Sequence, residues 1–188
     1  GPNVLLITLD TTRADAIGPS ETPWIQRMAS QGTQFSLAMS TAPITQPAHL
    51  GILTGVPPYR SGVVTNGTHI GDRPEMLSHQ LKAGGWVTAA FVSATPLTRK
   101  FGWEQGWDHF GDTLSTGLLG SSRERGARQT VDEALGWLSL HKDQRFGVWL
   151  LLFDPHGPYA APGQSIDGRT DGPKLDLPAY WPDAHKAI

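Results

Sequence analysis

Three almost continuously apolar runs constrain this sequence more than any other feature. They are VLLITL at residues 4–9, WVTAAFV at 86–92 and FGVWLLLF at 146–153. A strand without polar alternation is buried on both faces, as in a parallel sheet that helices cover on both sides. Segments with helical signals separate the runs. The sequence therefore predicts an α/β fold, a three-layer α/β/α sandwich with a mainly parallel sheet.

The segments between these runs carry start and stop signals for helices. Thr22 followed by Pro23 is typical of a helix N-terminus, and Gly32 and Gly84 are typical of helix ends. The remaining elements follow from apolar spacing and composition. We expect helices at 24–30, 75–83 and 128–140, a short strand or extended segment at 35–39, an aromatic-rich loop against the sheet edge at 101–110 and a mobile Gly/Ser-rich stretch at 115–122.

Composition narrows the classes of function. The 188 residues carry a net charge of −2, which gives no reason to expect a nucleic acid or a membrane surface as a partner. The absence of cysteine removes disulfides, thiolate zinc sites and cysteine nucleophiles. No apolar run reaches the roughly 18 residues of a membrane span, and no signal peptide is visible, so the compartment stays unassigned. We interpret residues 1–188 as a single domain whose last part, 163–188, is irregular and rich in turns.

An aspartate follows two of the apolar runs. Asp10 and Asp154 would lie at the carboxyl edge of a parallel sheet, where open α/β sheets bind ligands. For Asp10 taken alone, a turn or a helix cap ranks slightly ahead of catalysis. The DPHGP segment is more specific, because Asp154 and His156 lie on a proline-bounded loop where a carboxylate and an imidazole can hold a metal or contact an anion. The alternative is a surface turn.

Segment 41–66 contains a hydroxyl on a proline-bounded turn just before a helix. Thr45 could cap that helix or act as a nucleophile, and capping is the better interpretation of the residue taken alone. A nucleophilic Thr45 requires activation, which a divalent metal ligated by Asp10 would supply. Asn66 would donate to a substrate oxygen or simply form an Asn-Gly turn. His49 is a core or capping histidine or belongs to the site, and the five histidines other than His49 and that of the DPHGP segment are interpreted as surface residues.

Five blocks of sequence lie in order from about residue 3 to residue 162, namely NVLLITLDTTRAD, TQPAHLGILTG, PPYRSGVVTNG, LKAGGWVTAAFV and LFDPHGPY. Together they resemble the sulfatase branch of the alkaline phosphatase superfamily. The resemblance implies an alkaline phosphatase-like fold, a metal ligand at Asp10, the nucleophile at Thr45 and, at His156, an imidazole that contacts the anionic group of the substrate. It also implies a domain that is incomplete at the C-terminus, since the later Asp-His-Gly segment that completes the family's metal site is missing.

The chain departs from the sulfatase pattern at the nucleophile. Sulfatases carry there a cysteine or serine that is converted to formylglycine, followed by x-Pro-x-Arg. This chain has Thr45 instead, with His49 in place of the arginine. A threonine in this position, with an asparagine downstream like Asn66, is similar to the phosphodiesterase and phosphatase branches of the superfamily.

The residues and the resemblance together predict a metal-dependent hydrolase of sulfate or phosphate esters in which a threonine forms a covalent intermediate. The expected catalytic residues are Thr45, His156, Asn66 and His49, and the expected ligands of a divalent ion (Ca, Zn or Mn) are Asp10, Thr45 and Asp154. The expected substrate is a small-molecule or a glycan- or lipid-type ester, and a homo-oligomer is left open. The alternative is a non-catalytic or inactive sulfatase-like fragment that binds an anion or a protein partner.

Overall fold

The computed structural model describes residues 1–72, 74–114 and 124–156 and contains a sheet of four strands. The strands are β1 (Val4–Leu9), β2 (Val87–Phe91), β3 (His109–Gly111) and β4 (Phe146–Leu152), in the order β1-β4-β2-β3. Every pair is parallel, and the register aligns Leu9 of β1 with Leu152 of β4. The expected mobile stretch at 115–122 and the expected tail at 163–188 lie outside the described residues.

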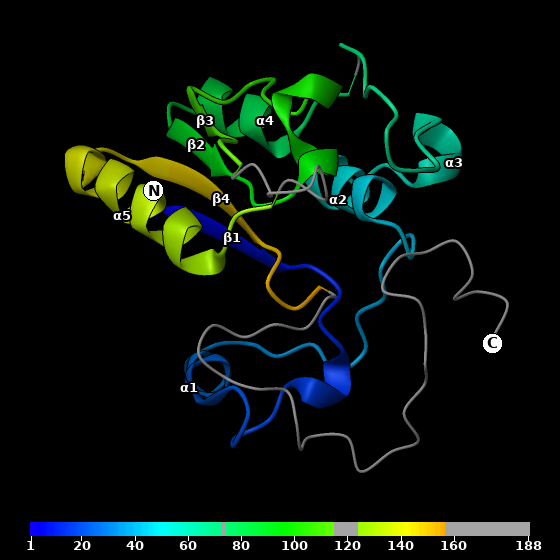
Figure 1. The fold of residues 1–188 in the computed structure, drawn as a ribbon. Coiled ribbons are helices and arrows are strands. Elements are labelled where there is room, and N and C mark those ends of the chain that lie inside the picture. The colour runs from blue at the N-terminus through cyan, green and yellow to red at the C-terminus, as the bar shows by residue number, and fades with distance from the viewer. Residues whose placement is uncertain (73, 115–123, 157–188) are drawn as a thin grey trace, which may run out of the picture.

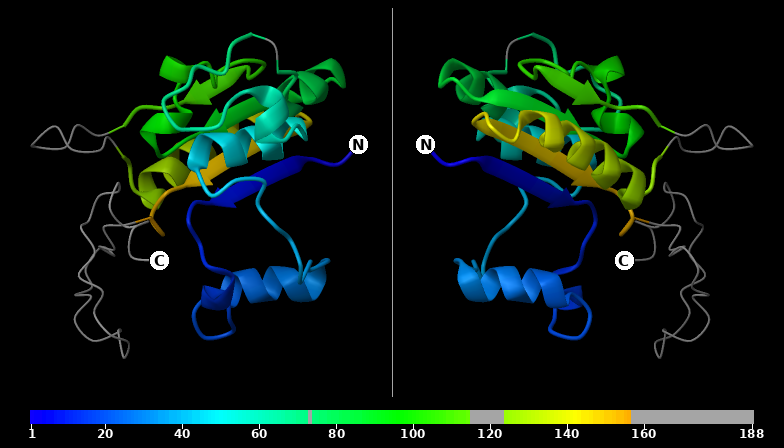
Figure 2. Two further views of the ribbon diagram at one scale, coloured as in Figure 1. Left: turned by 90° about the vertical axis from the view of Figure 1, so that its right-hand side faces the viewer. Right: turned by 90° about the vertical axis from the view of Figure 1, so that its left-hand side faces the viewer.

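Helices cover both faces of the sheet, as Figures 1 and 2 show. Helix α5 packs on β4 and β2 from one side, whereas α4 and α2 lie on the other side. The predicted three-layer α/β/α sandwich with a parallel sheet is therefore confirmed. The helices are η1 (Ala14–Ala16), α1 (Pro23–Gln31), α2 (Thr45–Thr54), α3 (Pro58–Ser61), α4 (Leu77–Ala83), η2 (Thr95–Leu97), η3 (Arg99–Phe101) and α5 (Ala127–His141).

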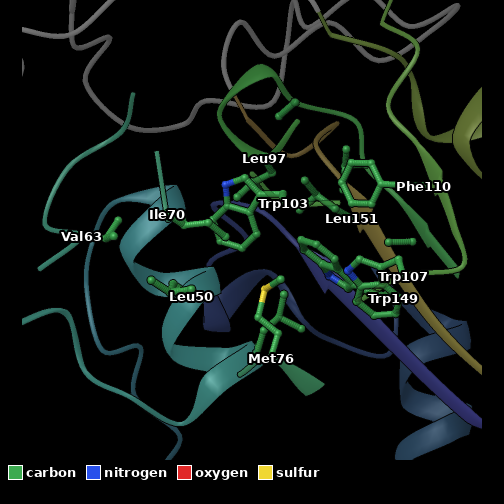
Figure 3. Packing of buried hydrophobic residues seen from close by; sticks show 14 of the residues in the cluster. Leu50, Val63, Ile70, Met76, Leu97, Trp103, Trp107, Phe110, Trp149 and Leu151 are labelled. Carbon is green, nitrogen blue, oxygen red and sulfur yellow. The ribbon is translucent and has the colours of Figure 1, made fainter. Parts of the chain in front are cut away.

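Successive residues of β4 enter two separate apolar cores. Trp149 and Leu151 join a cluster with Leu50 of α2, whereas Val148 joins a second cluster with Trp137 of α5. This alternation follows from the period of two along a strand. Figure 3 shows the larger cluster, in which Trp149 lies among side chains from α2 and from the loops around β2 and β3. Burial on both sides explains why the run at 146–153 lacks polar residues.

Strand β1 differs from its expected environment. It is an edge strand among the described residues, and Leu5 and Ile7 are 53% and 41% exposed. The expectation that this strand is buried on both faces is therefore wrong for the described part of the chain. The physical reason is that α5 packs on β4 and β2 and does not extend over β1, so the face of β1 that carries Leu5 and Ile7 stays open.

Two further expectations need correction. Residues 35–39 form no strand, and Phe35, Leu37 and Met39 are 79%, 85% and 85% exposed, because no neighbouring strand pairs with this segment in the described residues. The aromatic-rich segment at 101–110 was expected at the sheet edge. Its last two residues begin β3, which is an edge strand among the described residues, but its Trp103 is fully buried in the larger core.

Helix α1 forms where Thr22 and Pro23 predicted it. Thr22 is the N-cap residue, but its hydroxyl donates to Gly18 O (3.1 Å) instead of capping the helix. The helix lies apart from the sheet in Figure 2, and none of its residues is buried. Among the described residues, no helix combines the length and the apolar character needed to cross a membrane.

Candidate active site

Asp10 and Thr45 meet at the carboxyl edge of the sheet. Asp10 directly follows β1, its backbone N–H extends the ladder by donating to Leu152 O (3.0 Å), and it is 9% exposed. Thr45 is the first residue of α2, and its Oγ1 donates to Asp10 Oδ2 at 3.1 Å. The hydroxyl is therefore directed at the carboxylate, and it makes no capping hydrogen bond to α2, whose N-cap residue is Ile44.

The local sequence starts α2 at this point. Ile44 is extended (φ −127°, ψ 138°), and Pro47 lies in the first turn, where its missing N–H costs no helical hydrogen bond. The helix ends at Gly55, whose φ of 68° is in the left-handed region that glycine adopts without strain. The buried face of α2, including Leu50, anchors the helix in the core. Thr45 is thereby held at the start of a rigid element.

Asn66 caps α2 from a turn that is distant in sequence. Its Oδ1 accepts from the backbone N–H of Gln46 at 2.9 Å, one of the first-turn donors that a helix leaves unpaired. The following Gly67 has φ of 85°, so the Asn-Gly pair also forms the expected turn. Asn66 is exposed, and since its oxygen is used by Gln46, its NH₂ group is left as the donor toward solvent or a ligand.

His49 is a core histidine one turn after Thr45. It is 5% exposed, and its Nδ1 lies 2.8 Å from Thr45 O, which requires Nδ1 to carry the proton. Burial lowers the pKa of His49, while the hydrogen bond to Thr45 and the negative charge of Asp10 oppose that shift. The ring is therefore neutral near pH 7. Its Nε2 is a buried acceptor without a partner among the described residues. The centroids of the His49 and Trp149 rings lie 5.9 Å apart.

Asp154 and His156 follow β4, the neighbour of β1. Asp154 Oδ2 accepts from Ala127 N at 2.7 Å, so this carboxylate caps α5 at its positive end. The ring of His156 stacks on the ring of Phe153 with centroids 4.2 Å apart, and the backbone N–H of His156 donates to Phe153 O at 2.9 Å. The loop therefore holds both side chains at the edge that carries Asp10. The structure assigns Asp154 a capping role that the sequence did not indicate.

Two residues of this region were missed at the level of sequence. Gln46 is fully buried and hydrogen-bonded to Thr68, and its only sequence signal was a polar side chain next to Thr45 in the first turn of α2. Burial raises the pKa of Glu124, the positive charge of His156 opposes this, and the negative charge of Asp154 adds to it. No local pattern distinguished Glu124, because the charged groups near it, Asp154 and His156, lie in the loop after β4, far along the chain.

Two of the three expected metal ligands lie next to each other in the described residues. The carboxylate of Asp10 and the hydroxyl of Thr45 are adjacent oxygen donors, the kind that hard divalent cations prefer. In residues 1–72, 74–114 and 124–156 there is no group of three or more His, Asp or Glu side chains arranged to hold a metal. The donors fit a divalent cation in kind, and further ligands would have to complete the set.

Several solved structures share this fold. The chain is similar to the phosphonate monoester hydrolase of Agrobacterium radiobacter, with a TM-score of 0.71 and 18% identity over 87% of this chain and 43% of that one. It is also similar to a protein solved with its substrate D-glucosamine-2-N,6-O-disulfate, with a TM-score of 0.66 and 20% identity over 83% of this chain and 34% of that one. A member of the alkaline phosphatase superfamily from Vibrio parahaemolyticus matches with a TM-score of 0.59 and 18% identity over 91% and 45% of the two chains.

The sequence profile of the sulfatase family matches residues 2–174, and the chain therefore belongs to the sulfatase family. Human N-acetylgalactosamine-6-sulfatase is 32% identical over 105 residues, which is 46% of this chain and 20% of that protein. An uncharacterized sulfatase of Escherichia coli K12 is 29% identical over 92 residues, 46% of this chain and 18% of that protein. The chain thus spans about a fifth of the length of these curated relatives.

Proposed function

We propose that the protein to which this chain belongs hydrolyses sulfate or phosphate esters, with Thr45 as the nucleophile. The observation that carries the proposal is the hydrogen bond from Thr45 Oγ1 to Asp10 Oδ2 (3.1 Å) at the first residue of α2. Membership of the sulfatase family and an alkaline phosphatase-like fold support the same reaction class. The family match also favours a hydrolase over a non-catalytic anion-binding or partner-binding fragment.

Thr45 is placed to attack an anionic ester. Thr45 Oγ1 would form a bond to phosphorus or sulfur, while the bond from that atom to the alcohol oxygen breaks and the alcohol leaves with a proton. Water would then cleave the bond to Thr45, releasing inorganic phosphate or sulfate and restoring the hydroxyl. Asp10 would orient Oγ1 through the observed hydrogen bond. The positive end of α2 would attract the anionic group.

A divalent cation belongs to this proposal. Asp10 and Thr45 would hold it from β1 and α2, and Asp154 would join them from the loop after β4. Such a cation, when bound, lowers the pKa of a ligated hydroxyl and offsets negative charge on the substrate. Calcium, zinc and manganese all fit a site that contains carboxylate and hydroxyl oxygens.

Three further residues would act on the ester or on the nucleophile. The NH₂ group of Asn66 and the imidazole of His156 would donate to the non-bridging oxygens of the ester, where negative charge develops. His49 would act on Thr45, since its Nδ1–H holds the Thr45 carbonyl and thereby the first turn of α2.

The chemistry of the nucleophile favours phosphate or phosphonate esters over sulfate esters. Threonine is not converted to formylglycine, so Thr45 would act as a plain alkoxide, as in the phosphodiesterase and phosphatase branches that it resembles. One structurally similar protein is a phosphonate monoester hydrolase, and the human relative is named a sulfatase. Both ester classes therefore belong in the assay.

The test is turnover of an aryl phosphate and an aryl sulfate by the full-length protein with added Ca²⁺, Zn²⁺ or Mn²⁺. Thr45→Ala should lower kcat by on the order of 10³-fold or more, because no other hydroxyl replaces the nucleophile. Thr45→Ser serves as the matched control and should retain measurable turnover, since it keeps the hydroxyl. Full activity of Thr45→Ala on both esters would remove Thr45 from the mechanism.

Metal titration separates the hydrolase from the non-catalytic alternative. Calorimetry should show saturable binding of one of these cations to the full-length protein, and Asp10→Ala should weaken it. If no cation binds and Asp10→Ala changes nothing, the metal-dependent proposal is wrong and the anion-binding alternative is favoured.

A further inference from the structure

The side-chain amide of Gln46 is hydrogen-bonded through both its nitrogen and its oxygen to Thr68, in a turn that is distant in sequence. Its Nε2 donates to Thr68 O at 3.0 Å, and its Oε1 accepts from Thr68 N at 3.1 Å. The side chain is fully buried. Both backbone groups of Thr68 are therefore paired with one side chain from α2, in the way that two neighbouring strands pair.

The backbone of Gln46 makes a third bond to the same turn. Its N–H donates to Asn66 Oδ1 at 2.9 Å. Three hydrogen bonds thus join the residue directly after Thr45 to the turn that carries Asn66. Because Gln46 belongs to the first turn of α2, these bonds fix Asn66 in the same rigid frame as the hydroxyl of Thr45.

The bonds also select the orientation of the Asn66 amide. Gln46 N–H is a donor, so it must face the carbonyl oxygen of Asn66 and not its nitrogen. The NH₂ group of Asn66 consequently faces away from α2. Asn66 and Gly67 are exposed, so the tip of the turn gains little support from packing. Hydrogen bonds hold the turn, three of them to Gln46 and one within the turn, from Thr68 Oγ1 to Thr65 O (3.2 Å).

Nothing about packing requires an amide at position 46. A methionine has a similar length and would fill the same apolar surroundings, next to the buried Pro47 and near Leu50. A buried amide is tolerated because every bond to Thr68 is made, and such a fully satisfied polar group specifies one geometry.

We propose that Gln46 is a positioning residue that sets the Asn66 donor relative to Thr45 Oγ1. This inference rests on the proposed function, in which Asn66 donates to a non-bridging oxygen of the ester. Gln46 itself does not touch the substrate. It acts by holding the turn at residues 66–68, so its loss should affect the reaction through Asn66 alone.

The kinetic test is a double-mutant cycle in the full-length protein with an aryl phosphate. Gln46→Met should lower kcat by about 10- to 100-fold, the loss expected for a misplaced transition-state donor, with a much smaller change in KM. Asn66→Ala should have a similar effect, and the double variant should be no slower than Asn66→Ala. Multiplicative losses would show that Gln46 does not act through Asn66, and the proposal would fail.

Thr88→Val is the matched control for lost stability. Thr88 is also fully buried and hydrogen-bonded, to Asp108 Oδ2 (3.0 Å), but it lies near the amino end of the interior strand β2, away from the carboxyl ends of the strands, where the candidate site lies. The Thr88→Val substitution should lower the midpoint of thermal unfolding and leave kcat unchanged. If Gln46→Met does not fold, Gln46→Asn replaces it, since the shorter side chain stays uncharged but cannot bond both backbone groups of Thr68 as Gln46 does.

Amide hydrogen exchange tests whether Gln46 holds the turn at residues 66–68, and it does not depend on catalytic activity. Exchange at Thr68 N should accelerate at least about tenfold in Gln46→Met and stay unchanged in Thr88→Val. Unchanged protection of Thr68 in the Gln46 variants would overturn the inference. Failure of the proposed function is distinguishable, because Thr45→Ala would then keep full turnover while the exchange at Thr68 still reports whether Gln46 holds the turn.

Discussion

The buried imidazole of His49 should make the fold less stable in mild acid. His49 is 5% exposed, and burial lowers its pKa because an imidazolium at this position would lose its hydration. In the unfolded chain a histidine titrates near a pKa of about 6.5. Below that pH the unfolded state binds more protons than the folded state, so the free energy of unfolding decreases as the pH falls.

A single proton sets the size of this effect. Above a pH of about 6.5 the imidazole is neutral in both states, and its contribution to stability is complete and constant. Between that pH and the lower pKa of the folded state, this one group removes up to about 1.4 kcal/mol per pH unit from the free energy of unfolding. Once the pH falls through the folded-state pKa, that contribution is lost.

The assay is urea unfolding of the full-length protein and of His49→Asn between about pH 8 and about pH 5. Asparagine cannot titrate in this range, and it keeps a side-chain N–H that can reach the Thr45 carbonyl one turn back. The stability of the wild type relative to the variant should be constant above about pH 7 and should fall as the pH decreases to about 5, by at most about 2 kcal/mol. Parallel pH profiles of the two proteins would refute the assignment of His49 as a buried neutral imidazole.

Two further substitutions test how the site is held. Asp154→Ala should lower the free energy of unfolding by about 1 kcal/mol in urea titrations, because Ala127 N at the start of α5 loses its cap, whereas Asp154→Asn should keep the cap. Equal losses for both variants would argue against capping. Gly51→Ala should reduce kcat more than its effect on thermal unfolding suggests, because the added Cβ would overlap Thr41 Oγ1 and push the segment before Thr45 away from α2. Restoration of kcat by Thr41→Ala in that background is expected, and an unaffected Gly51→Ala enzyme would contradict it.

The layers of the fold could be predicted because their cause is local in sequence. A strand that is apolar at nearly every position needs cover on both faces, and Trp149 and Val148 of β4 enter opposite cores as this reasoning requires. The exposure of Leu5 in β1 could not be predicted, because the pattern reports the environment for which a strand is suited and not which helices reach it. Strand β3 was missed because three residues are too few to show a period.

The candidate site, like the fold, could be predicted from the sequence only in part. The meeting of Asp10 with Thr45 followed from the rule that parallel strands end at one edge, and the structure places Oγ1 of Thr45 within hydrogen-bond distance of Asp10. Contacts that depend on the paths of loops could not be predicted. Gln46 bonds Thr68, 22 positions along the chain, and Asp154 caps α5 at Ala127, 27 positions back. No spacing in the sequence indicates either contact.

A search for a covalent adduct on Thr45 is the most direct test of whether Thr45 is the nucleophile. The full-length protein would be mixed with an aryl phosphate and its preferred cation, quenched in acid during turnover and digested for mass spectrometry. We expect a phosphoryl group on the peptide that contains Thr45, at the residue itself, and no adduct in Thr45→Ala. Turnover by the wild type without any adduct, together with full activity of Thr45→Ala, would show that Thr45 is not the nucleophile.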